Sequence, residues 1–87
     1  MVKYKTDKVD GREFTIWLAD KEEMRKLGKI WIKDDSFHEV ISWPLENTVP
    51  DPDGIWRLGD VVVYEGAKNI DFLMKHGVKH LLGEHHE

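Results

Sequence analysis

The chain has 87 residues, 40% of them hydrophobic, and a formal net charge of −4. This length allows one domain, residues 1–87, because a chain of this size buries only about 60–65% of the surface that it exposes when unfolded. The absence of cysteine excludes disulfide bonds, thiolate metal sites and cysteine nucleophiles. The longest apolar run, residues 61–64, is far too short to span a bilayer, and no signal peptide is recognisable, so we expect a cytoplasmic protein without a membrane partner.

The charges are distributed unevenly along the chain. Residues 1–33 carry nine basic against six acidic side chains, whereas residues 34–60 carry only Arg57 against seven carboxylates. Phosphate binding needs a basic face, so this pattern predicts that nucleic acid is not a partner. The many charged residues and the lack of glutamine are typical of thermophilic proteins.

The first elements predicted are two strands. Residues 2–6 and 14–18 alternate apolar and polar side chains, and Asp10 and Gly11 mark a turn between them. This pattern predicts a β-hairpin with a connection longer than the tight two-residue type.

A short helix is predicted next. Asp20 and Glu23 have the spacing of a helix start, residues 21–27 are good helix formers, and Gly28 stands where a left-handed cap is usual. Residues 30–32 alternate again and predict a strand.

Residues 37–43 are ambiguous. Ser36 and Glu39 fit a capping box and favour a helix, whereas the β-branched and aromatic content and the following Pro44 favour a strand. We prefer the strand.

The remaining segments complete an α+β fold. Residues 45–54 predict a loop, residues 55–58 and 61–64 a strand or a bent strand pair around Gly59, residues 67–77 a helix, and residues 78–82 a final strand. The expected fold is therefore a mixed sheet of about five to six strands with two helices, including a C-terminal strand–helix–strand unit.

The acidic middle segment is the first candidate site. Calcium binds six to eight oxygen ligands, and loops supply them by placing carboxylates around a tight glycine turn. The loop Pro-Asp-Pro-Asp-Gly at residues 50–54 has this character, although it lacks several EF-hand ligands and is equally typical of a solvated turn. The metal ligands that we predict are Asp51, Asp53, Asp60, Asp34, Asp35 and Glu39.

Histidines form a second candidate site. His76 and His80 are four residues apart, and Glu84-His85-His86-Glu87 follows, so a zinc site is conceivable. We expect Gly77 to end the helix and separate the two rings, which disfavours zinc.

Tryptophans give a third interpretation. Trp17 and Trp31 lie opposite the core-facing residues of their predicted strands, so either helices cover both sheet faces or an aromatic patch is exposed to a protein partner. No nucleophile elbow or nucleotide-binding loop is recognisable, so we assign no catalytic or cofactor-binding residue and lean against an enzyme.

The order of elements, the acidic middle segment, and the endings Gly-Val-Lys-His-Leu-Leu and Gly-Glu-His-His-Glu resemble a small conserved hypothetical family from methanogenic archaea. The resemblance implies a compact α+β fold and calcium binding through an acidic cluster. The sequence thus predicts a domain that binds a divalent cation, most readily calcium. The alternative is a non-catalytic module that binds a protein partner through exposed tryptophan and a charged surface.

Overall fold

The computed structural model describes residues 1–9, 11–33, 36–45, 50 and 52–82. In chain order its elements are strands β1 (Val2–Val9) and β2 (Arg12–Ala19), helix α1 (Lys21–Leu27), π-helix η1 (Gly28–Ile32), strands β3 (Val40–Pro44) and β4 (Arg57–Tyr64), and helix α2 (Ile70–Leu81). The α+β class with a mixed sheet and two α-helices is confirmed. The described residues form four strands, fewer than the five to six expected.

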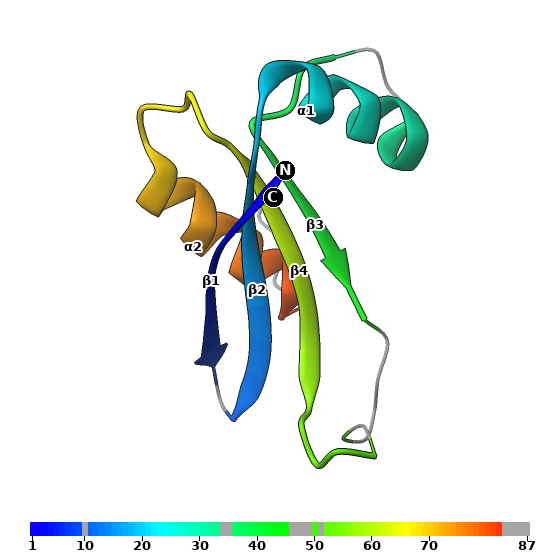
Figure 1. Cartoon of the computed structure of the whole chain (residues 1–87), viewed down its shortest axis with the longest axis vertical. Helices are drawn as coiled ribbons and strands as arrows, with labels where there is room; N and C mark the ends of the chain where they lie inside the picture. Colours follow the sequence, from blue (N-terminus) through cyan, green and yellow to red (C-terminus); the bar gives the residue numbers. More distant parts are fainter. Residues whose placement is uncertain (10, 34–35, 46–49, 51, 83–87) are drawn as a thin grey trace.

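The sheet has the order β1-β2-β4-β3. β1 pairs antiparallel with β2, β2 parallel with β4, and β3 antiparallel with β4, so β3 forms one edge (Figure 1). The predicted hairpin and the predicted strand at residues 61–64 are confirmed. The turn residue Asp10 lies outside the described residues.

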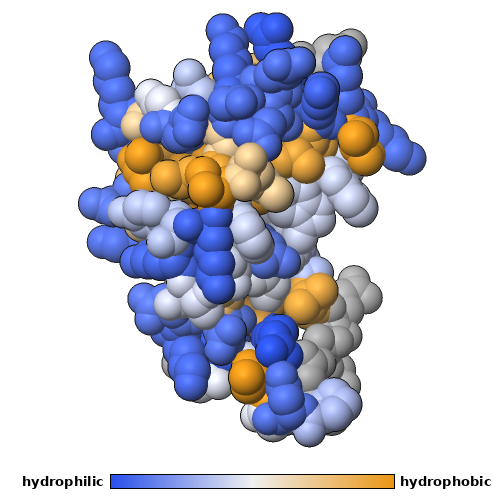
Figure 2. All heavy atoms as spheres, viewed as in Figure 1, coloured by the Kyte–Doolittle hydropathy of each residue, from blue (hydrophilic) through white to orange (hydrophobic). Residues whose placement is uncertain are grey.

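Each face of the sheet has its own apolar cluster. Ile16, Val61 and Val63 pack with Met74 of α2 on one face. Val62 packs with Met24 of α1 on the other. Because α1 is only seven residues long, it covers part of that face, and Figure 2 shows a band of apolar side chains between hydrophilic regions.

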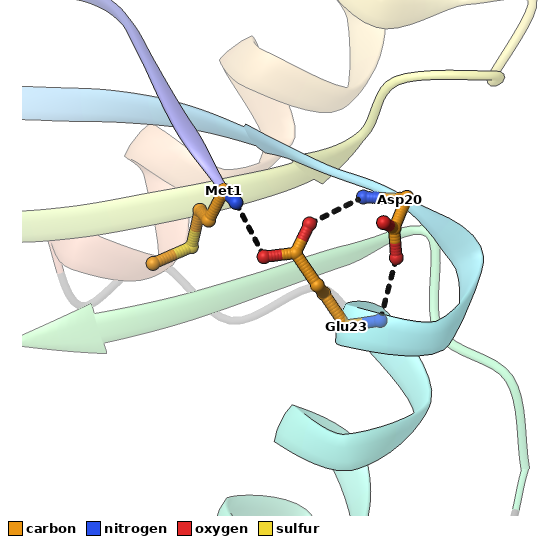
Figure 3. Close-up of polar contacts among 3 residues, drawn as sticks. All are labelled: Met1, Asp20 and Glu23. Atoms are coloured by element: carbon orange, nitrogen blue, oxygen red, sulfur yellow. Dashed lines mark hydrogen bonds and ion pairs between the residues drawn. The ribbon is translucent and has the colours of Figure 1, made fainter.

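The helix start predicted at Asp20 and Glu23 is confirmed, and the two residues form a capping box. The Asp20 carboxylate accepts a hydrogen bond from the Glu23 backbone N–H at 2.8 Å, and the Glu23 carboxylate accepts one from the Asp20 N–H at 3.2 Å. The same carboxylate contacts the Met1 ammonium group (Figure 3). These donors, the Met1 ammonium first, lower the pKa of Glu23.

The strand predicted at residues 30–32 is a π-helix instead. Gly28 has φ −60° and continues the helix rather than capping it. The chain leaves the helix at Lys33, which has φ 59° and donates its N–H to the Gly28 carbonyl at 2.8 Å. Ile30, Trp31 and Ile32 are all exposed, so the period-2 pattern does not mark a buried strand face here.

The strand predicted at residues 78–82 is also wrong, because α2 continues to Leu81. Met74, Gly77 and Leu81 are its buried residues, which is a helical spacing. The C-terminal strand–helix–strand unit therefore does not form within the described residues. The ambiguous segment 37–43 forms strand β3 from Val40, as preferred from the sequence.

Candidate active site

His76 and His80 lie one turn apart on α2, with their rings in contact. The two Nε2 atoms are 2.9 Å apart, and the ring centroids are 4.5 Å apart at 79°. Two nitrogens bound to one tetrahedral zinc ion at about 2.0–2.1 Å would lie about 3.4 Å apart. A small separation of the rings therefore gives a bidentate nitrogen site, and the residues fit a transition metal.

Helix α2 continues through residue 77. Glycine occupies this position because the packing against β4 leaves no room for a side chain. A Cβ atom at residue 77 would lie 2.5 Å from Val61 Cγ1 of β4. The Ser42 hydroxyl of β3 donates to the Gly77 carbonyl at 3.1 Å. The expectation that Gly77 ends the helix and separates the rings is wrong, because this glycine serves helix–sheet contact.

The histidine pair borders a hollow between α2 and the edge strand. Its volume is about 350 Å³, and its other wall is formed by Val40, Ile41, Ser42 and Pro44 of β3 with Ile32 of η1. Phe72 lies one turn before His76, with the two rings 6.3 Å apart and 17° from parallel. The histidine pair is thus accessible from this hollow.

Within the described part of the chain, no three or more histidine, aspartate or glutamate side chains gather in one metal-binding cluster. The sequence supplies a candidate third ligand. His76, His80, Gly83 and His86 have the spacing His-x3-His-x2-Gly-x2-His of a known three-histidine zinc motif, with Gly77 in place of that motif's glutamate. This spacing was the signal that the sequence analysis missed. Gly83 and His86 lie outside the described residues.

The predicted carboxylate ligands have other contacts where they are described. Asp53 pairs with Arg57 at 2.9 Å and accepts the Ile55 N–H at 3.0 Å; these contacts, the Arg57 hydrogen bond first, lower the pKa of Asp53. Asp60 accepts the Trp17 indole N–H at 3.1 Å. Glu39 is exposed, immediately before β3. Asp34, Asp35 and Asp51 lie outside the described residues.

The tryptophans are partly covered. Trp17 is half-buried beside α1, and Trp31 of η1 is 61% exposed with its ring edge-on to Trp43 at 6.0 Å. Together with Leu27 and Val62 they border a hollow of about 440 Å³ on the face opposite α2.

Comparison with known proteins gives a consistent set of relatives. The chain is 33% identical over 92 residues to endoribonuclease YbeY of Renibacterium salmoninarum, an alignment that covers 86% of this chain and 59% of that protein. It is 30% identical over 88 residues to YbeY of Aquifex aeolicus, covering 86% and 57%, and 29% identical over 90 residues to YbeY of Staphylococcus saprophyticus, covering 85% and 59%.

The chain resembles bacterial YbeY endoribonucleases. It spans slightly under three fifths of the length of these relatives. No family model matches it.

This similarity overturns several expectations from the sequence. The resemblance to a calcium-binding family of methanogenic archaea is wrong, because the relatives are bacterial YbeY proteins. The predicted function, a calcium-binding domain or a non-catalytic interaction module, is wrong for the same reason. The exclusion of nucleic acid is also wrong, because the relatives are endoribonucleases, a class of enzyme that acts on RNA. No described helix is long and apolar enough to cross a membrane.

The charge argument failed because it used sums over segments. Lys75 and Lys79 immediately precede the two histidines on α2, and both side chains are exposed. With Lys5 they border a hollow between α2 and the β1–β2 hairpin, so basic side chains gather locally in a way that a net charge of −4 conceals.

Proposed function

We propose that this chain is the catalytic part of a metal-dependent endoribonuclease. The observation that carries the proposal is the 2.9 Å approach of the His76 and His80 Nε2 atoms at the border of an open groove. The similarity to YbeY endoribonucleases supports this reaction class. Cytoplasmic residence, expected from the sequence, belongs to the same proposal.

His76 and His80 supply two ligands of the metal, and His86 supplies the third by its spacing. Imidazole nitrogen suits zinc and related transition metals, whereas calcium takes oxygen ligands. A bound metal of this kind would polarise a phosphoryl oxygen and lower the pKa of a coordinated water.

The other residues of the site bind and orient RNA. Lys75 and Lys79 are exposed on α2, where with Lys5 they line a separate hollow between α2 and the β1–β2 hairpin, and their charges attract the RNA backbone to this side of the helix. The hollow between α2 and β3 has a volume of about 350 Å³, the size of a small-molecule site, which favours a nucleotide of an unpaired strand as its occupant. The position of the usual glutamate base is occupied by Gly77, so a proton acceptor must come from another residue or from solvent.

The test is cleavage of short single-stranded RNA by the metal-loaded chain. We expect activity with zinc or a similar ion, loss on treatment with a chelator, and recovery when metal is restored. His76→Ala and His80→Ala should each lower cleavage by more than about 100-fold, since they remove metal ligands whose supporting residues alone contribute 10–100-fold. Cleavage that resists both substitutions contradicts the proposal.

The matched control is Lys21→Ala. This exposed lysine lies on α1 and does not border the hollow that the histidines line. Its substitution should leave cleavage unchanged, which separates loss of the site from a general reduction in positive charge.

A further inference from the structure

Two hollows lie one after the other along α2. One is the histidine hollow, between β3 and the pair His76 and His80. The second, about 510 Å³, is bordered by Glu39, which directly precedes β3, and by residues at the start of α2, namely Ala67, Lys68, Asn69, Phe72 and Leu73. Phe72 of the second hollow and His76 of the first have their ring centroids 6.3 Å apart. We call the two hollows together the α2–β3 groove.

Phe72 is unusually exposed for its type. Its side chain is 67% accessible, although the next residues, Leu73 and Met74, turn toward the core. The ring lies almost parallel to the His76 ring, at 6.3 Å and 17°. Core packing does not explain a phenylalanine at this position, because the ring is mostly exposed to solvent. The ring instead presents a flat apolar surface inside the groove, next to His76.

The groups around Phe72 suit a nucleotide. Lys68 lies in the turn just before α2 and is exposed, and the ammonium group of a lysine pairs with phosphate. Asn69 and Glu39 offer hydrogen-bonding groups of the kinds that contact base edges. Exposed aromatic rings combined with cations are the features that bind single-stranded nucleic acids.

We propose that Phe72 is a stacking platform for an RNA base next to the phosphate that is cleaved at the histidine pair. This inference rests on the proposed endoribonuclease function and adds a substrate-binding residue to it. Residues 72 and 76 are four positions apart on the helix, which is about 6 Å along its axis. The stacked base and the reacting phosphate therefore belong to neighbouring nucleotides. The strand lies along α2, with its flanking phosphate near Lys68.

The test uses short single-stranded RNA carrying one 2-aminopurine, whose fluorescence is quenched when it stacks. The label is placed at successive positions, and binding is measured with chelator present so that the RNA stays intact. We expect wild type and Phe72→Trp to quench one position strongly. Phe72→Leu, which keeps an apolar side chain without the ring, should abolish that quenching and weaken binding about 5- to 150-fold, the range for loss of one stacked base.

Cleavage kinetics supply the second measurement. Phe72→Leu should raise KM by a similar factor with kcat little changed, and titration with zinc should show unaltered metal affinity. The matched control is Trp31→Leu. Trp31 is a similarly exposed aromatic residue, and it borders the tryptophan hollow on the opposite face of the sheet. It should leave quenching and KM as in wild type.

The outcomes separate the two proposals. RNA cleavage by wild type with quenching and KM unaffected by Phe72→Leu overturns the stacking role alone. A loss of zinc affinity in Phe72→Leu that matches its loss of cleavage also overturns it, because Phe72 would then only support His76. Failure of wild type to cleave any RNA under metal-loaded conditions removes the endoribonuclease proposal itself.

Discussion

Gly77 of α2 and Val61 of β4 approach so closely that no side chain fits between them. A Cβ atom at residue 77 would lie 2.5 Å from Val61 Cγ1. This contact holds α2 close to the sheet at the point where the helix bears His76 and His80, which flank Gly77 and border the hollow beside β3. The packing of one glycine thus determines where the two imidazoles stand relative to β3.

Gly77→Ala should destabilise the protein although alanine is the better helix former. Alanine gains about 1 kcal/mol of helix propensity, but overpacking a rigid core costs about 1–3 kcal/mol, and Val61 is fully buried with little room to move. We expect a lower unfolding midpoint in urea. The control is the double variant with Val61→Ala, in which the added methyl group fits the vacated space and costs less. Equal effects in both backgrounds would contradict the packing explanation.

Glu23 should contribute a pH-dependent stabilisation of α1. Its pKa is lowered in the folded state, chiefly by the Met1 ammonium and then by the Asp20 N–H, so the ionised form is favoured by folding. This stability is present above the unfolded pKa, near 4.5, and is lost as the pH falls through the lower folded value.

The measurement is the unfolding free energy of wild type and Glu23→Gln between pH 7 and 3. The difference between them should shrink toward zero as the pH falls, and it should be smaller at high salt because the site is exposed. Glu22→Gln, on the same first turn but outside the capping box, is the control. A wild-type advantage that is constant with pH would show that ionisation of Glu23 is not responsible.

Local sequence patterns predicted the elements whose cause is local. The hairpin, the Asp20–Glu23 capping box and strand β3 all follow from side-chain alternation or short-range hydrogen bonds. The π-helix after Gly28 and the continuation of α2 past Gly77 did not, because a glycine in sequence reads as a helix stop. Gly77 is present for contact with a strand distant in sequence, which no local rule reveals.

The candidate site was missed for the same reason. The sequence predicted that α2 ends at Gly77, so that His76 and His80 would not share a helix. The carboxylates were therefore the stronger candidate for a metal site. The structure instead gives Asp53 a partner in Arg57 and Asp60 a partner in Trp17. The spacing from His76 to His86 was readable from the sequence, but its meaning depends on an unbroken helix.

Asp60 should be a structural hydrogen-bond acceptor for Trp17. Asp60→Asn retains a side-chain oxygen for the indole N–H, whereas Asp60→Ala removes it and leaves a half-buried donor unpaired. We expect Asp60→Ala to lose about 1–2 kcal/mol of unfolding free energy and Asp60→Asn clearly less, measured by urea denaturation. The pair Trp17→Phe and Asp60→Ala should be non-additive. Additive losses would mean that the contact contributes little.

His85 and His86 provide a matched pair for the third metal ligand. They are adjacent and chemically identical, so their substitutions change composition, charge and size equally, and only His86 has the spacing of the three-histidine motif. His86→Ala should weaken zinc affinity and RNA cleavage nearly as much as His76→Ala, whereas His85→Ala should leave both close to wild type.

Zinc affinity is measured by competition with a colorimetric chelator, which needs no RNA and therefore reports on the ligands alone. Affinity should also fall at low pH for wild type, because protons compete with the metal for imidazole nitrogen. If His85→Ala has the larger effect, the motif register is wrong by one residue. If neither variant changes affinity while His76→Ala does, the third ligand lies outside this histidine pair and the three-histidine assignment fails.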